Sequence, residues 1–160
     1  MTPTPDSVNE LIAEGRIERV PVDPAIVQRM LRQATQNADG ARREADAGNP
    51  AGGHALAWDA ARVAITAHML HNGLRPTSKP GHHAAVVTYA EACLGDIADL
   101  HDLESLDRVR RTRNRSEYDA IPVSRTMFDG DEPGVRRVVQ AIVKQLVVPG
   151  DPGGSSTRAT

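Results

Sequence analysis

Residues 54–72 read HALAWDAARVAITAHMLHN, and this stretch decides the fold class. Its apolar side chains recur at the spacing of one helix face, at Leu56, Ala60, Val63, Ala67 and Leu70. Seven of residues 51–67 are alanine, and such small side chains let neighbouring helices approach closely. Gly73 then provides a natural end for a helix. The stretch therefore predicts a helix over 54–72 that packs among other helices.

The segments on both sides of this stretch carry the same helical period. Five more helices are predicted, over about 7–20, 24–47, 82–100, 103–118 and 131–146. Ser7 and Glu10 have the spacing of a capping box, which predicts the start of the first helix. Asp23 followed by Pro24 is typical of a helix start and predicts the beginning of the second.

The breaks between these helices are predicted from glycine and proline. Residues 48–53, GNPAGG, separate the second helix from the third. Turn-rich loops are expected over 74–81 and 120–130. The last helix is expected to begin near Asp131, which puts Pro133 in its first turn, where proline is tolerated.

The composition favours an all-α chain. Only four residues are aromatic, whereas strands favour aromatic and β-branched side chains. A chain of 160 residues is long enough for one domain with a hydrophobic core. Gly, Pro, Ser and Thr dominate the end of the chain. We therefore expect a single helical domain over 1–148 and a disordered tail over 149–160.

Charge and targeting signals limit the function classes. The formal net charge is −2, so any contact with nucleic acid needs a local basic patch. The single cysteine, Cys93, excludes an internal disulfide. The first residues lack the features of a secretory signal, and no stretch reaches the roughly 18 apolar residues that span a bilayer. We therefore expect a cytoplasmic protein with no membrane partner.

A local basic patch is present at residues 108–118, RVRRTRNRSEY. Its five arginines are Arg108, Arg110, Arg111, Arg113 and Arg115. On a helix, Arg110, Asn114 and Tyr118 share one face, where guanidinium, amide and hydroxyl groups are suited to holding a phosphate. Acidic residues just before the arginines also fit a solvated helix whose charges complement its dipole. From charge alone, both interpretations stay open.

The order Arg113–Asn114, three residues and then the polar ring of Tyr118 resembles the signature of the HEPN superfamily. Other segments resemble bacterial HEPN groups in the same order along the chain: LIAEGRIE at 11–18, WDAAR at 58–62, NGLRP at 72–76 and GHH at 81–83. The resemblance covers roughly residues 8–120. It implies an antiparallel bundle of four to five main helices. It also implies a homodimer whose late helices meet at the interface.

Many HEPN proteins are metal-independent ribonucleases in which Arg and His of both protomers form one composite site. The resemblance implies that Arg113, Asn114 and Tyr118 occupy the catalytic positions. The other arginines of this segment are expected to bind RNA phosphates: Arg108, Arg110, Arg111 and Arg115. Tyr118 stands where the catalytic His is expected, and a phenol with a pKa of about 10 is a poor general base near neutral pH. His101, which precedes this segment, is a candidate substitute.

Three functions therefore stay open. The first is an RNA-associated or partner-binding module of a bacterial toxin–antitoxin or defence-type system, with ribonuclease activity doubtful because of Tyr118. The second is an active metal-independent ribonuclease, and the third is a protein-only interaction module or antitoxin. Four histidines that a helical hairpin brings together lack a carboxylate at ligand spacing: His68, His71, His82 and His83. Capping or hydrogen-bonding roles are favoured for them, and no metal or cofactor is expected.

Overall fold

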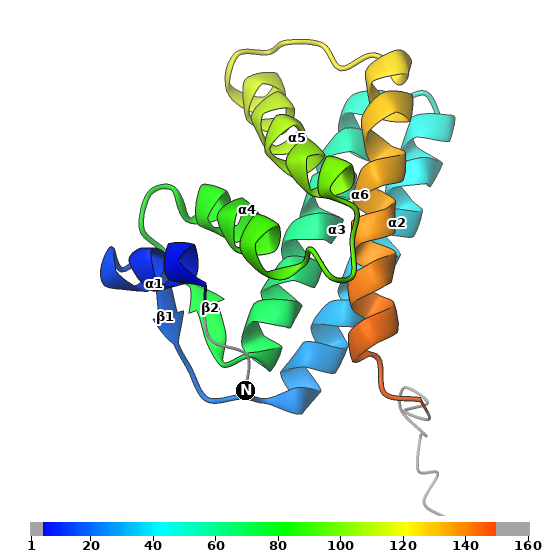
Figure 1. Ribbon diagram of the computed structural model, residues 1–160. Helices are drawn as coiled ribbons and strands as arrows, with labels where there is room; N and C mark the ends of the chain where they lie inside the picture. Colours follow the sequence, from blue (N-terminus) through cyan, green and yellow to red (C-terminus); the bar gives the residue numbers. More distant parts are fainter. Residues whose placement is uncertain (1–4, 150–160) are drawn as a thin grey trace, which may run out of the picture.

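The computed structural model describes residues 5–149, and the predicted tail lies, beyond its first residue, outside them. This part of the chain is mostly helical, as the composition predicts. Its helices are α1 (Asp6–Ala13), α2 (Pro24–Asp46), α3 (Pro50–His71), α4 (His82–Cys93), α5 (Leu100–Tyr118) and α6 (Arg125–Leu146) (Figure 1). Two short strands, β1 (Ile17–Arg19) and β2 (Leu74–Pro76), form one sheet. No described helix combines the length and the apolar content needed to cross a membrane.

The predicted start of the second helix is confirmed, whereas the predicted start of the first helix is wrong. Asp23 caps α2 as predicted, because its Oδ1 accepts hydrogen bonds from two backbone N–H groups of the first turn, at 3.0 and 3.3 Å. The capping box predicted at Ser7 and Glu10 is wrong. Pro5 is the N-cap residue of α1, and Ser7 already lies inside the helix.

The start of α3 corrects the predicted break at 48–53. Asn49 is the N-cap, and its Oδ1 accepts the backbone N–H of Gly52 at 3.0 Å. Pro50 takes the first helical position, where its missing N–H has no cost. Gly52 and Gly53 are therefore helical, and α3 begins four residues before the predicted start at His54. A sequence of Asn followed by Pro starts a helix here rather than ending one.

The later helix boundaries also differ from prediction. α4 ends at Cys93 rather than at Leu100, because a turn follows in which the Ile97 and Ala98 N–H groups both bond to the Leu94 carbonyl. α5 then begins at Leu100, whose side chain is 66% exposed, so its match to the period of the preceding helix is incidental.

The predicted loop over 120–130 is shorter than expected, because α6 begins at Arg125. Ser124 caps this helix by accepting the backbone N–H of Met127 at 3.2 Å. Pro133 therefore lies inside α6 and not in its first turn. At that position proline cannot donate to the carbonyl of Asp129, so α6 lacks one internal hydrogen bond.

The two-stranded sheet was not predicted from the sequence. β1 pairs antiparallel with β2, and Ile17 lies opposite Pro76. Glycines with positive φ precede both strands, Gly15 at +70° and Gly73 at +72°. Thr77 donates its hydroxyl hydrogen to the Gly15 carbonyl at 2.7 Å. The sheet therefore ties the end of α1 to the end of α3.

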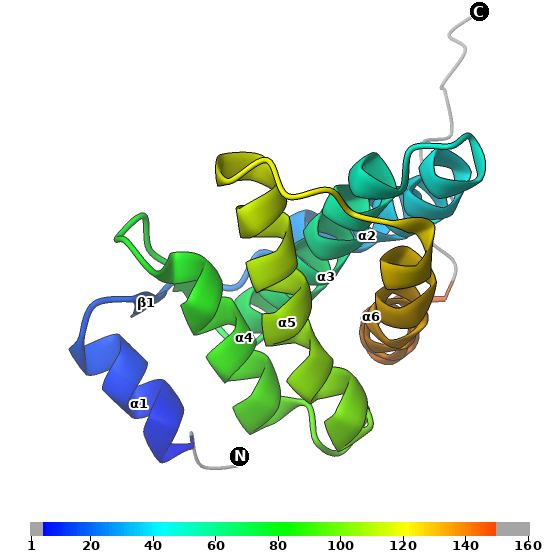
Figure 2. The same ribbon diagram turned by 90° about the horizontal axis from the view of Figure 1, so that it is seen from above.

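Three long helices, α2, α3 and α6, lie side by side in both views (Figures 1 and 2). α6 runs antiparallel to α2, since Gln28 Nε2 donates to the Leu146 carbonyl and Arg125 donates to the Ala45 carbonyl at the other end. α5 packs across α3 and α6, and α4 lies beyond α5. α1 is outermost, against α4.

α3 is the central helix, and its side chains are buried on nearly every face. The apolar face predicted for this helix is only partly buried. Ala60, Val63 and Ala67 are buried, whereas Leu56 and Leu70 are partly buried. The predicted inner face of α5 is confirmed, because three of its residues are fully buried: Leu103, Leu106 and Val109. This orientation turns the arginines of α5 away from the core.

Close packing between α2 and α3 predicts an effect of adding a single methyl group. A Cβ at Gly53 would lie 2.6 Å from the Ala41 carbonyl oxygen and 3.0 Å from the Phe128 ring, so Gly53→Ala is expected to destabilise the fold by about 1–3 kcal/mol. The matched control is Gly130, a helical glycine in α6 with nothing within 4 Å of its added Cβ. Gly130→Ala should stabilise by about 0.5–1 kcal/mol in urea denaturation. Equal effects of the two substitutions would contradict the packing.

Candidate functional site

The five arginines of α5 do not form one free basic surface. Four of them pair with carboxylates: Arg108 with Asp131 at 2.9 Å, Arg110 and Arg111 with Asp107 at 2.7 Å each, and Arg113 with Glu117. Burial raises the pKa of Asp107, but the hydrogen bonds and charges of its two arginines outweigh this and hold the pKa below its usual value. Arg115 is exposed and has no side-chain partner within residues 5–149.

The face predicted from helical spacing, Arg110 with Asn114 and Tyr118, is not assembled as a single site. The side chain of Arg110 is only 17% exposed and is held by Asp107. Asn114 is partly buried, and its amide has no hydrogen-bond partner in the described chain. Tyr118 is 79% exposed at the end of α5. The phenol therefore projects into solvent rather than toward a reacting group.

Arg113 is the predicted residue that reaches a cavity. The cavity has a volume of about 200 Å³ and lies between the first turns of α3 and the last turns of α5. We call it the α3–α5 cavity; its lining residues are Ala51, His54, Ala55, Arg113, Ser116, Glu117 and Val123. A single water needs only about 10–15 Å³ measured in this way, so the cavity has room for a group larger than one water.

His54 forms the buried wall of the α3–α5 cavity and is 1% exposed. Its Nε2 lies 3.0 Å from Oδ2 of Asp131, and the other oxygen of Asp131 accepts from Arg108. Burial raises the pKa of Asp131, but the hydrogen bonds from His54 and Arg108 and the charge of Arg108 outweigh it, so the pKa falls below its usual value. Since Asp131 is ionised, Nε2 of His54 carries a proton and donates it. Nδ1 has no partner among the described residues.

A pair of histidine rings lies near Arg113, where α4 begins. His82 and His83 have ring centroids 4.2 Å apart, and His83 also contacts the buried ring of Trp58 at 6.1 Å. Burial lowers the pKa of His83, and the charges of His82, Arg62 and Arg113 lower it further against the opposing charge of Asp59. Arg113 therefore lines the cavity and also acts electrostatically on His83 at the start of α4.

His101 does not meet Arg113 within one chain. It lies exposed in the first turn of α5, about 18 Å along the helix from Arg113. His68 is buried, and its Nδ1 lies 2.8 Å from the hydroxyl of Tyr89. Residues 5–149 contain no group of three or more His, Cys, Asp and Glu side chains arranged to hold a metal ion.

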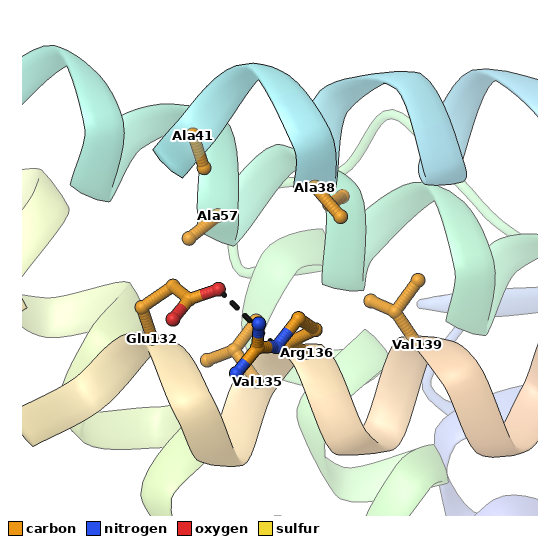
Figure 3. A pocket seen from close by; sticks show the side chains of 8 residues that line it. Ala38, Ala41, Ala57, Glu132, Val135, Arg136 and Val139 are labelled. Atoms are coloured by element: carbon orange, nitrogen blue, oxygen red, sulfur yellow. Dashed lines mark ion pairs between the residues drawn. The ribbon is translucent and has the colours of Figure 1, made fainter. Parts of the chain in front are cut away.

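A second hollow, between α2, α3 and α6, is structural. Alanines of α2 and α3 face Glu132, Arg136 and Val139 of α6 across it (Figure 3). It leaves no room for a water molecule. Glu132 is 3% exposed, and its Oε1 lies 3.3 Å from Arg42 and 3.5 Å from Arg136. The pair of Glu132 with Arg42 joins α6 to α2, whereas the pair with Arg136 lies within α6.

His54 is the residue of this site that sequence reasoning missed. Its partner Asp131 is 77 positions away, so no local spacing connects the two. The position of His54 at the edge of a glycine-rich segment made it look like a helix start rather than a cavity wall. Comparisons with models of protein families and with curated proteins find no match to this chain.

The bond between His54 and Asp131 predicts a pH-dependent effect of Asp131→Asn. At pH 7 the variant should lose about 1–3 kcal/mol of unfolding free energy, because the charge-assisted hydrogen bonds to His54 and Arg108 are lost. The folded pKa of Asp131 is lowered, so its contribution is full above its unfolded pKa of about 3.9 and vanishes as the pH falls through the folded value. Urea denaturation at a series of pH values should show wild type and variant converging in acid.

The control for this prediction is Asp129→Asn. Asp129 lies one turn earlier on α6 than Pro133 and pairs with exposed Arg125 at 2.8 Å. An exposed pair of this kind contributes less than about 1 kcal/mol, so the control should change stability little at any pH. A loss as large as that of Asp131→Asn would contradict a special role for the His54 bond.

Proposed function

We propose that this chain is a HEPN-like, RNA-associated module of the cytoplasm and that Arg113 is its principal phosphate contact. The observation that carries the proposal is the position of Arg113, whose side chain lines the α3–α5 cavity and whose charge also acts on His83. Arg108, Arg110 and Arg111 are less available, because each is bound to an aspartate. The sequence resemblance implies that Arg113 is the arginine of the HEPN signature.

The ion pair of Arg113 with Glu117 does not prevent this role. The Glu117 side chain is 48% exposed, and ion pairs between residues four apart on a helix contribute only about 0.3–0.5 kcal/mol. A phosphate oxygen therefore replaces the carboxylate at little cost. Ser116 lines the same cavity and adds a hydroxyl donor for a phosphate.

The resemblance also supports a homodimer joined through the late helices, as part of a toxin–antitoxin or defence-type system with a cognate partner protein. The exposed side chains of Tyr118 and Met127, at 79% and 38%, offer contact area near the C-terminal end of α5 and the start of α6. Tyr118 then serves as a contact residue at the edge of the site, and Arg115 beside it remains free for a further phosphate.

Arg113→Ala is expected to weaken binding of a single-stranded RNA at least about tenfold at low salt, because a charge-assisted hydrogen bond to phosphate is lost. The slope of log affinity against log salt should fall by about 0.7, the value for one phosphate contact on a single strand. Fluorescence anisotropy over a range of salt concentrations measures both quantities.

The control variant is Arg29→Ala, which removes the same charge from an exposed position in the first turns of α2. It should leave the salt slope unchanged. If Arg113→Ala has the same slope as wild type, Arg113 does not hold a phosphate and the proposed function fails.

A second function, metal-independent ribonuclease, is favoured by one observation. The imidazole of His54 lines the same cavity as Arg113, whereas Tyr118 does not. In such a reaction the proton of a ribose hydroxyl is taken up by a base while an arginine holds the phosphate.

The ribonuclease function predicts that wild-type protein cuts a mixed RNA pool in the presence of a chelator. Arg113→Ala and His54→Gln should each abolish cutting, and Tyr118→His should leave or increase it. Gel electrophoresis of the RNA measures the outcome, with circular dichroism as the check on folding. If the wild-type protein is folded and the RNA stays intact, the ribonuclease function fails and the first function, a binding module, stands.

A further inference from the structure

The α3–α5 cavity is lined by both members of one ion pair. Arg113 and Glu117 bond to each other across one turn of α5, and their side chains are 25% and 48% exposed, so a ligand reaches both. In the proposed function a phosphate replaces the Glu117 carboxylate on Arg113. The carboxylate then lies beside an anion without its cation. An ionised carboxylate only accepts hydrogen bonds, so N–H donors on the same ligand would restore its partners.

The space in the cavity suits one planar ring system. Its volume is about 200 Å³, below the roughly 300–1,000 Å³ of pockets that take drug-sized ligands. Three lining residues are apolar, Ala51 and Ala55 of α3 and Val123 of the segment after α5. Proteins read single-stranded RNA through bases that are splayed out of the stack. A splayed base next to the phosphate on Arg113 would therefore have apolar walls for its faces and Glu117 for its edge.

The hydrogen-bonding edges of the four bases favour guanine. Its Watson–Crick edge presents two adjacent donors, N1–H and the N2 amino group, which match the two oxygens of a carboxylate. Adenine and cytosine each present one amino group next to an acceptor nitrogen, and uracil presents one N–H between two carbonyl oxygens. With these three bases an acceptor would face the negative charge of Glu117, which accepts but does not donate.

We propose that the α3–α5 cavity binds an unpaired guanine of an RNA strand, whose N1–H and N2 amino group donate to Glu117 while Arg113 holds a phosphate of the same strand. The inference rests on the proposed RNA-associated function and adds a base preference to it. Arg113 contributes affinity for any sequence, because every nucleotide carries a phosphate. Glu117 contributes the choice of base, because paired bonds to a charged group discriminate strongly between bases.

The experiment compares fluorescein-labelled oligouridines of equal length that differ only in one central residue, which is guanosine, inosine or adenosine. Inosine keeps N1–H and lacks the N2 amino group, so it removes one of the two donors. Wild-type protein is expected to bind the guanosine strand at least about fivefold more tightly than the inosine strand, because one hydrogen bond to a charged group is lost. The adenosine strand should bind more weakly still. Fluorescence anisotropy at low salt measures the three dissociation constants.

Glu117→Gln tests the assigned residue. Its amide has one acceptor oxygen in place of two, so the variant should bind the guanosine and inosine strands equally. Its affinity for every strand should rise, because a negative charge beside the phosphate is removed. The control is Glu104→Gln, which removes the same charge from an exposed position near the start of α5 and should keep the wild-type preference.

Free guanosine 5′-monophosphate distinguishes a strand from a nucleotide as the source of the base. A strand gains further phosphate contacts outside the cavity, for example at exposed Arg115. The mononucleotide should therefore displace labelled RNA only at concentrations at least about tenfold above those of the unlabelled guanosine strand. Displacement at equal concentrations would assign the cavity to a free nucleotide and overturn the inference.

The comparison of guanosine with inosine uses the wild type alone, so it does not depend on the folding of a variant. Equal affinity of the wild type for these two strands overturns the inference and leaves the RNA-associated function intact. A Glu117→Gln protein that still prefers guanosine over inosine overturns it as well. Failure of the wild type to bind any of the three strands overturns the proposed function and the inference together.

Discussion

The close approach of the α2 and α3 backbones is the constraint on which the rest of this structure depends. Gly53 lies so close to the Ala41 carbonyl that no side chain fits between them. Gly134 of α6 lies instead against the side chain of Asp102 in α5. The alanines of α3 continue this close contact along the helix. Because α3 is enclosed on nearly every face, its buried histidines depend on partners from other elements. His54 has such a partner for one ring nitrogen, and its other ring nitrogen has none in the described chain.

The packing of α6 is fixed by charge as well as by apolar contact. Asp131 bonds to α3 and α5, Glu132 pairs with Arg42 of α2, and Arg137 makes two 2.8 Å hydrogen bonds with buried Asp102 of α5. Each of these bonds forms only when α6 has one particular orientation about its own axis. Removing one partner leaves a poorly solvated charge, whereas the apolar side chains beneath tolerate small shifts. The ion pairs therefore specify the arrangement that brings His54 and Arg113 to one cavity.

Much of the fold follows from local pattern, and most of the site does not. The period of 103–118 predicts which side of α5 is buried, and Asp23 followed by Pro24 predicts a cap that is present. Asn49 before Pro50 obeys the same capping chemistry, but the glycines after it resemble a break. The strands have three residues each, too few for a detectable alternation. Arg113 is recognisable in sequence, whereas its neighbour His54 depends on a bond between distant helices.

The bond between Gln28 of α2 and the Leu146 carbonyl of α6 spans 118 positions, so it forms only once that much of the chain has been synthesised. The hairpin of α2 and α3 needs no such long closure and is favoured to form early. Until α6 arrives, His54 has no Asp131 and the cavity has no fixed imidazole. A partly folded or newly synthesised chain therefore has the arginines of α5 without the oriented ring. The complete site therefore requires α6 to be in place.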